Sequence, residues 1–217
     1  MNLEQIISNL IKYKAEIIKK LSANHWHPYF LIKEKFSNNI LDDEFKRCFC
    51  GFYIMNGPMG LNDFQKNEFF RLLSDKENNL EKILRVLYEI SGYGRRHRLF
   101  LSFGTKLLHT IDNNLPIYDR NIAYVLKLEN QIAGTLETKV KNRISIYNEL
   151  KNDFDLLLKN PKIVSCLKDM RVEIYKAMMK NNFEWKDDFV SNTKLLDSSL
   201  WALYDSLKSR SVHKKSK

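Results

Sequence analysis

Hydrophobic side chains recur along most of the chain at intervals of three and four residues, which is the spacing of one face of an α-helix. No segment of any length alternates between hydrophobic and polar residues, as a half-buried strand would. The pattern therefore predicts an all-α protein of about nine helices. The expected helices lie near residues 3–21, 41–55, 64–73, 80–90, 97–111, 116–126, 140–158, 161–180 and 193–208.

Turn-forming residues mark several of the helix ends. Asn56-Gly57-Pro58 stops the second helix, Gly92-Tyr93-Gly94 stops the fourth, and Asp112-Asn113-Asn114 is a turn. Pro116 is expected to open the helix that follows, because proline is favoured in the first turn. No linker divides the chain. We therefore expect one domain over residues 1–208, built either as one helical body or as two helical lobes around a cleft.

The overall charge points to a polyanionic partner. The 217 residues include 36 Lys and Arg against 26 Asp and Glu, which gives a net charge of +10. Part of this excess lies in the basic segment 209–217, which we expect to be a flexible tail. No glycine-rich phosphate-binding motif such as GxGxxG or GxxxxGK[ST] occurs, so nucleotide-binding folds that depend on one are not expected.

The cysteines and the hydrophobic segments limit the cellular compartments in which the protein is expected. Cys48, Cys50 and Cys166 are too few to hold a four-cysteine iron–sulfur cluster, and their spacing suits core packing better than zinc binding. We expect no metal and no cofactor. The first residues lack the pattern of a signal peptide, and no run of apolar residues is long enough to span a membrane. These features predict a cytoplasmic protein that does not bind a membrane.

The basic residues in the body of the chain are concentrated in one interval. Between Glu89 and Asp112 there is no acidic residue, whereas basic and histidine residues are frequent there. The interval contains Arg95, Arg96, His97, Arg98, Lys106 and His109. Backbone N–H groups of a glycine turn, together with nearby cations, can bind phosphate. The alternative is an ordinary solvated helix face.

Two adjoining motifs favour the first interpretation. The segment Ser102-Phe103-Gly104-Thr105-Lys106-Leu107-Leu108-His109 is followed by Leu115-Pro116-Ile117-Tyr118-Asp119-Arg120-Asn121-Ile122. Together they resemble the active-site region of the helix-hairpin-helix DNA glycosylase superfamily, in which a G-x-K motif precedes an apolar-Pro-apolar-x-Asp motif. The resemblance is closest to the 8-oxoguanine glycosylase-like branch without an iron–sulfur cluster. It covers about residues 90–127, with the hairpin and the catalytic segment.

The resemblance implies that Lys106 is a nucleophile and that Asp119 is the catalytic carboxylate. These residues are 13 positions apart, which is shorter than the family's usual spacing. In a competing register, Gly92-Tyr93-Gly94-Arg95-Arg96 is the hairpin and Arg96 takes the lysine position. Arginine remains protonated in proteins and cannot form a Schiff base, so we prefer Lys106.

The resemblance further implies a monomeric DNA glycosylase for base excision in DNA repair, with or without AP-lyase activity, that binds duplex DNA with a flipped base. The expected DNA-binding residues are Gly92, Gly94, Arg95, Arg96, Arg98, Gly104, Thr105, His109 and Arg120. Aromatic candidates for the walls of a base pocket are Phe52, Tyr53, Tyr118, Phe183, Trp185 and Trp201. The segment His25–Tyr29 is expected to be a turn packed by Trp26. Two alternatives stay open: a helical DNA-binding module without catalytic activity, and a protein-interaction domain.

Overall fold

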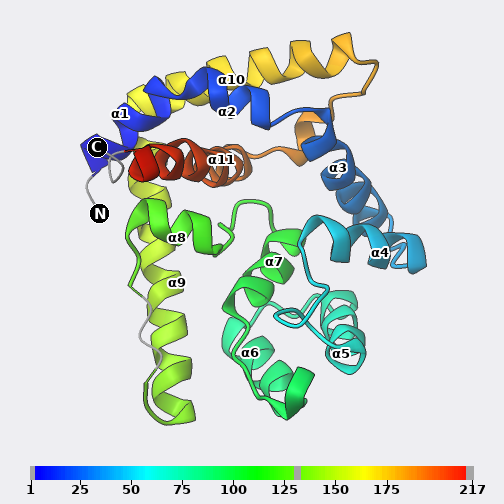
Figure 1. The fold of residues 1–217 in the computed structure, drawn as a ribbon. Helices are drawn as coiled ribbons and strands as arrows, with labels where there is room; N and C mark the ends of the chain where they lie inside the picture. Colours follow the sequence, from blue (N-terminus) through cyan, green and yellow to red (C-terminus); the bar gives the residue numbers. More distant parts are fainter. Residues whose placement is uncertain (1–2, 130–132, 214–217) are drawn as a thin grey trace.

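The computed structural model describes residues 3–129 and 133–213, and within these ranges all regular secondary structure is helical (Figure 1). The all-α prediction is confirmed. The helices are α1 (Leu3–Lys12), α2 (Lys14–Lys20), α3 (Ala23–Ser37), α4 (Asp43–Phe52), α5 (Asp63–Ser74), α6 (Leu80–Glu89), α7 (Leu101–Ile111), α8 (Arg120–Leu126), α9 (Leu136–Lys159), α10 (Pro161–Lys180) and α11 (Asn192–His213). Two short 3₁₀ turns, η1 (Tyr93–Arg95) and η2 (Asp187–Phe189), complete the list.

The described residues contain two more helices than expected, both near the N-terminus. The first predicted helix is divided at buried Tyr13 into α1 and α2. The expected turn over His25–Tyr29 is instead part of α3, so that prediction was wrong. Trp26, Tyr29 and Phe30 recur at helical spacing and are buried, and this burial stabilises a helix that contains Pro28. The expected core position of Trp26 is confirmed, since its side chain is fully buried.

The start of α8 also differs from the expectation. Pro116 does not open this helix, which begins at Arg120. Asp119 has extended backbone angles and is the N-cap, because its carboxylate accepts a hydrogen bond from the N–H of Asn121 at 2.8 Å. Aspartate is among the best N-cap residues, so the helix begins where a side chain can satisfy its first free N–H groups. Residues 112–119 therefore form an irregular segment between α7 and α8.

Most helices form two groups, α3 and α4 pack against each other, and all of them contribute to one hydrophobic core (Figure 1). In one group α11 packs against α1, α2, α8, α9 and α10, and α10 lies across the top of the view. In the other group α7 packs against α5 and α6, and α6 also contacts α9. The irregular segment 112–119 crosses from the second group to the first. No helix in the described part of the chain is long and apolar enough to cross a membrane.

The predicted tail lies partly outside the described residues. Helix α11 continues to His213, so the described part of segment 209–217 is helical. Residues 214–217 are outside the described range.

Gly104 lies in the middle of α7, where this helix packs closely against α6. A Cβ atom added at Gly104 would lie 2.9 Å from Cδ1 of Leu80, with Ile83 and Leu84 also within 4 Å. The predicted role of Gly104 in DNA binding is therefore not supported by its position, since the residue is buried between two helices. Its missing side chain permits close helix packing instead.

We expect Gly104→Val to lower the free energy of unfolding by about 1–3 kcal/mol, because the added methyl groups would push α6 away from α7. Gly51→Val is the matched control, since a Cβ at Gly51 has no other atom within 4 Å. Urea denaturation of both variants measures the difference. Equal losses in the two variants would show that the α6–α7 contact does not need a glycine.

Candidate functional site

A pocket of about 470 Å³ lies where the two groups of helices meet. Its walls come from the end of α2, the start of α3, the end of α4, the middle of α7, the irregular segment 112–119, α8 and α11. The polar and aromatic side chains in these walls include His25, Lys106, Asp119, Lys194, Asp197 and Trp201. The structure thus brings Lys106 and Asp119, the two residues expected to be catalytic, into one cavity. Arg96, which the competing register would use, does not line it.

Lys106 is an almost fully buried lysine without a carboxylate in direct contact. Only 8% of the residue is exposed, and its Nζ donates a hydrogen bond to the carbonyl oxygen of Tyr53 at 3.1 Å. Burial lowers the pKa of Lys106 to about 8, although the charges of Asp119 and Asp197 act in the opposite direction. An amine with this pKa is neutral at pH 7 about 300 times more often than an ordinary lysine. Lys106 can therefore act as a nucleophile near neutral pH.

A second buried pair, Lys194 and Asp197, lines the same pocket. Their side chains are 3% and 6% exposed, and Nζ of Lys194 lies 3.2 Å from Oδ2 of Asp197. Burial raises the pKa of Asp197, and the ion pair with Lys194 partly offsets this effect. The sequence shows only a lysine and an aspartate three positions apart, which on most helices is a solvent-exposed pair. Their role in the pocket was therefore missed.

Aromatic rings form one wall of the pocket. The ring of His25 stacks on that of Trp201 with their centres 5.8 Å apart and lies 5.6 Å from the ring of Phe52. Burial lowers the pKa of His25 to about 3, so the imidazole is neutral, and it shares a hydrogen bond of 3.1 Å with the hydroxyl of Ser198. Of the predicted aromatic candidates, Phe52, Tyr53 and Trp201 line this pocket.

The predicted basic turn lies between α6 and α7 and is exposed. Gly94 and Arg95 both have positive φ, and the N–H of Gly92 donates to the carbonyl oxygen of Arg96 at 2.9 Å, which closes the turn. Arg95 and Arg96 are exposed, whereas Arg98 is half-buried and contacts the sulfur of Met59 at 3.3 Å. This turn presents several cations to solvent and does not line the pocket.

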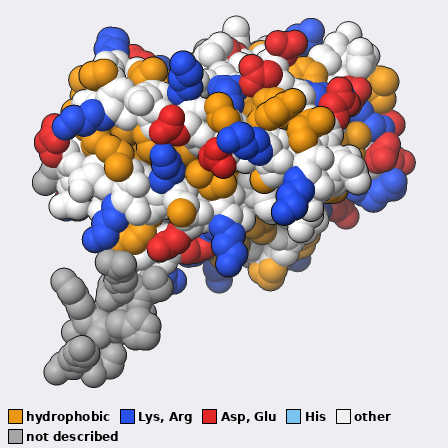
Figure 2. Space-filling model, turned by 90° about the horizontal axis from the view of Figure 1, so that it is seen from above, with side chains coloured by type: hydrophobic (Ala, Val, Ile, Leu, Met, Phe, Trp, Pro, Cys, Tyr) orange, Lys and Arg blue, Asp and Glu red, His pale blue; other side chains and the backbone are white. Residues whose placement is uncertain are grey.

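The other basic side chains are distributed differently. Figure 2 views the molecule from the side of α10 and shows Lys and Arg interspersed with Asp and Glu. On this face the basic excess of the chain is not gathered into one patch.

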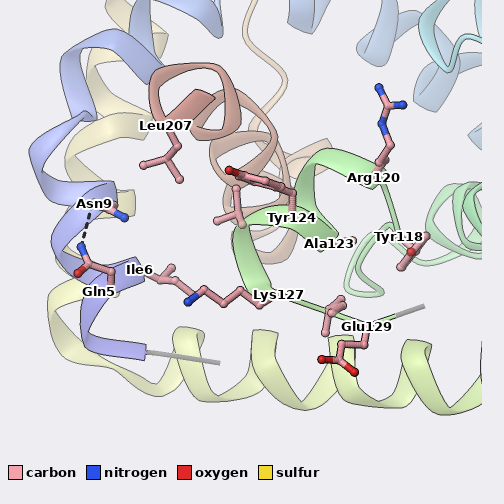
Figure 3. Close-up of a pocket in the computed structure, with 12 residues that line it drawn as sticks. Gln5, Ile6, Asn9, Tyr118, Arg120, Ala123, Tyr124, Lys127, Glu129 and Leu207 are labelled. Atoms are coloured by element: carbon pink, nitrogen blue, oxygen red, sulfur yellow. Dashed lines mark hydrogen bonds between the residues drawn. The ribbon is translucent and has the colours of Figure 1, made fainter. Parts of the chain in front are cut away.

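Besides Gly104, three of the residues predicted to bind DNA lie away from the basic turn. Thr105 and His109 are fully buried and bind the backbone of segment 112–119. Because they face inward from α7, they do not reach a surface where DNA could bind. Arg120 is exposed, but it lies in a different hollow, a groove of about 790 Å³ between α1, α8 and α11. Figure 3 shows its guanidinium pointing away from Lys127 and Glu129 in that groove.

The groove in Figure 3 is a weaker candidate for a reactive site. Gln5, Lys127 and Glu129 are exposed, and Gln5 makes a hydrogen bond of 3.1 Å with Asn9. In the residues that line it, no lysine or carboxylate is buried. Lys106, Lys194 and Asp197, which are buried, line the pocket of Lys106 instead. In the described ranges, no group of three or more His, Cys, Asp and Glu side chains is placed to hold a metal ion.

Comparison with protein-family models, with curated proteins and with solved structures found no match to this chain. Membership of the helix-hairpin-helix glycosylase superfamily therefore remains a prediction from the two sequence motifs. The candidate site is defined by its geometry and electrostatics alone.

Lys106 makes the stability of the protein depend on pH. Its pKa is lowered from 10.5 to about 8 on folding, so the folded state disfavours the ammonium form. This cost is complete below pH 8, decreases between pH 8 and 10.5, and is absent above that range. Lys106→Met removes the cost. We therefore expect the free energy of unfolding of the variant, relative to wild type, to fall by about 2–3 kcal/mol between pH 7 and pH 10.5. Denaturation curves that differ by the same amount at every pH would contradict the lowered pKa.

Proposed function

We propose that the protein is a DNA glycosylase with AP-lyase activity, in which Lys106 is the nucleophile and Asp119 assists it. The observation that carries the proposal is a buried lysine with a pKa near 8 that shares a pocket with the carboxylate of the adjoining motif. Buried amines with lowered pKa and a nearby charged group are concentrated at reactive sites. The pocket, the exposed basic turn and the two motifs support the same function.

The chemistry uses both residues. The neutral Nζ of Lys106 attacks C1′ of the deoxyribose, and the glycosidic bond breaks as the base leaves with the electron pair and takes up a proton. Positive charge that develops on the sugar is stabilised by the Asp119 carboxylate. Nζ gives up its two protons, one to the departing base and one to O4′ as the C1′–O4′ bond breaks and the sugar ring opens, and the new C1′–N bond becomes an imine. Loss of a proton from C2′ breaks the C3′–O bond, and the 3′ phosphate leaves.

The same pocket has the features needed to hold an extruded base. A base that leaves the DNA stack needs a flat apolar wall and a few hydrogen-bonding groups. The stacked rings of His25 and Trp201 form such a wall, and Lys194, Asp197 and Ser198 supply donors and acceptors. The volume of about 470 Å³ is enough for a base and its sugar.

Trapping with sodium borohydride tests the nucleophile, because borohydride reduces an imine between a lysine and an abasic site to a stable amine. We expect wild type to form this adduct with duplex DNA that carries one abasic site, and Lys106→Met to form at least about 100 times less, since the attacking amine is gone. Lys33→Met is the matched control. Lys33 is also buried with a pKa near 8, but its Nζ donates to the carbonyl oxygen of Thr110 and it does not line the pocket.

The trapping rate of wild type should rise with pH and level off above about pH 8, following the neutral fraction of Lys106. Mass spectrometry of the digested adduct identifies the modified lysine. An adduct on Lys194 would show that Lys194, and not Lys106, is the nucleophile. No adduct with wild type, or equal adducts with both lysine variants, would reject the lyase.

The basic turn is expected to bind the DNA backbone. Replacement of Arg95, Arg96 and Arg98 by serine should weaken binding to duplex DNA. It should also make the slope of log K against log salt shallower by about 2–3, because the variant makes fewer phosphate contacts and therefore releases fewer counterions when it binds. The matched control replaces Lys162, Lys168 and Lys180 of α10, which lies at the other end of the molecule (Figure 1). Fluorescence anisotropy at several salt concentrations measures both slopes.

These measurements also separate the alternative functions. Salt-dependent binding without a borohydride adduct would indicate a DNA-binding module that lacks the chemistry. If wild-type binding is weak and equal slopes are found for both triple variants, the basic turn instead serves an acidic protein partner.

A further inference from the structure

The irregular segment 112–119 is bound to its surroundings by buried side chains rather than by backbone ladders. Nδ1 of His109 lies 2.7 Å from the carbonyl oxygen of Leu115. Oδ1 of Asp197 accepts from the N–H of Ile117 at 3.3 Å, and Oγ1 of Thr105 accepts from the N–H of Tyr118 at 3.0 Å. Three backbone groups within four residues are thus satisfied from outside the segment. The last of these groups directly precedes Asp119.

Two of the three side chains come from the helix that carries the nucleophile. Thr105 and His109 are one helical turn apart on α7 and lie on either side of Lys106 in the sequence. Both are fully buried. Each has a second bond that fixes its orientation: the hydroxyl of Thr105 donates to the carbonyl oxygen of Ser102 at 3.1 Å, and Nε2 of His109 lies 3.3 Å from the hydroxyl of Tyr29.

The third side chain comes from α11 and is itself held in place. Asp197 is bound by Lys194 through its other oxygen, so one carboxylate joins the pocket lysine to the segment. An ionised carboxylate can only accept hydrogen bonds, which matches the N–H that Ile117 presents. The buried Lys194 compensates the charge that this arrangement places inside the protein.

We propose that Thr105, His109 and Asp197 are positioning residues that fix the Asp119 carboxylate relative to Lys106. This inference rests on the proposed function, in which Lys106 and Asp119 act together on the substrate. Asp119 caps a short helix, α8, that packs on α11, and it follows the irregular segment that comes from α7. Its distance from α7 therefore depends on how this segment is held. Groups that act together on a reacting atom must be held to within about half an ångström. The three hydrogen bonds supply this constraint.

Thr105→Val tests the inference, because valine keeps the shape of the side chain and removes the acceptor for Tyr118 N–H. We expect it to slow borohydride trapping about tenfold or more, as misplaced catalytic groups lose rate steeply. Thr105→Ser restores the hydroxyl and should recover most of the rate. Thr110→Val is the matched control: Thr110 is equally buried on the same helix, but its hydroxyl donates to the carbonyl oxygen of Lys106 within α7 and not to segment 112–119.

A measurement without DNA tests the positioning itself. The charged groups that face Lys106 are Asp119 from the irregular segment and Asp197 and Lys194 from α11, and the phenol of Tyr53 at the end of α4 is the other titratable group beside it. Asp119 raises the pKa of Lys106, so a displaced Asp119 must lower it. NMR titration of the Lys106 Cε resonance should show a lower pKa in Thr105→Val and in Asp119→Asn. Thr105→Val added to Asp119→Asn should cause no further shift.

The outcomes separate the inference from the proposed function. An unchanged Lys106 titration in folded Thr105→Val, or an additive shift in the double variant, overturns the positioning role. Absence of a borohydride adduct with wild type rejects the lyase, while the NMR titration still decides whether Thr105 holds Asp119 near Lys106. Thermal melts of each variant check that it is folded.

Discussion

An irregular segment in a protein interior must have its backbone N–H and C=O groups bound by something other than a helix or a sheet. Here that requirement applies to the inner part of segment 112–119, which connects the two groups of helices: Pro116 and Ile117 are buried, whereas Asp112 and Asn114 are exposed. Thr105, His109 and Asp197 satisfy it from α7 and α11. Because the segment also forms part of the pocket wall, the same hydrogen bonds that make the crossing possible determine the shape of the pocket.

The pocket concentrates charge that is unfavourable for folding. Lys106, Lys194 and Asp197 are all nearly fully buried, and each has lost most of its hydration. An apolar filling of the same volume would be at least as stable by general experience with buried ion pairs. Natural proteins place charged groups in the core, instead of apolar ones, most often at a functional site. The electrostatics therefore support a reactive site here more strongly than the volume of the pocket does.

Most of the fold could be predicted from the hydrophobic pattern, because a helix that buries one face repeats its apolar residues every three to four positions. The pattern did not show that Tyr13 interrupts the first helix or that α3 continues through Pro28, since tertiary burial decides both. Local motifs predicted Lys106 and Asp119 as a pair, and they share a pocket. They could not separate residues that face DNA from residues that face the core. A glycine at position 104 would be expected both where the backbone approaches a phosphate and where it packs against a side chain such as Leu80.

Lys194 and Asp197 could not be predicted at all, because a lysine and an aspartate one helical turn apart are common on exposed helices. What makes them part of the site is their burial, which depends on how α11 packs against segments far away in the sequence. Thr105 and His109 were predicted from the resemblance to bind DNA. Their inward direction became clear only from the bonds that they make to Tyr118 and Leu115.

Three lysines are buried among the residues that the structure describes, and one of them is suited to react. Lys33 donates to the carbonyl oxygen of Thr110 in the last turn of α7, where a cation is favoured by the helix dipole, and it does not line the pocket. Lys194 lines the pocket, but its Nζ is already engaged in an ion pair with Oδ2 of Asp197 at 3.2 Å. Lys106 lines the pocket and donates directly only to a backbone carbonyl, and burial lowers its pKa to about 8. Burial without a direct carboxylate partner, combined with access to the cavity, makes Lys106 the lysine that can lose its proton and meet a substrate.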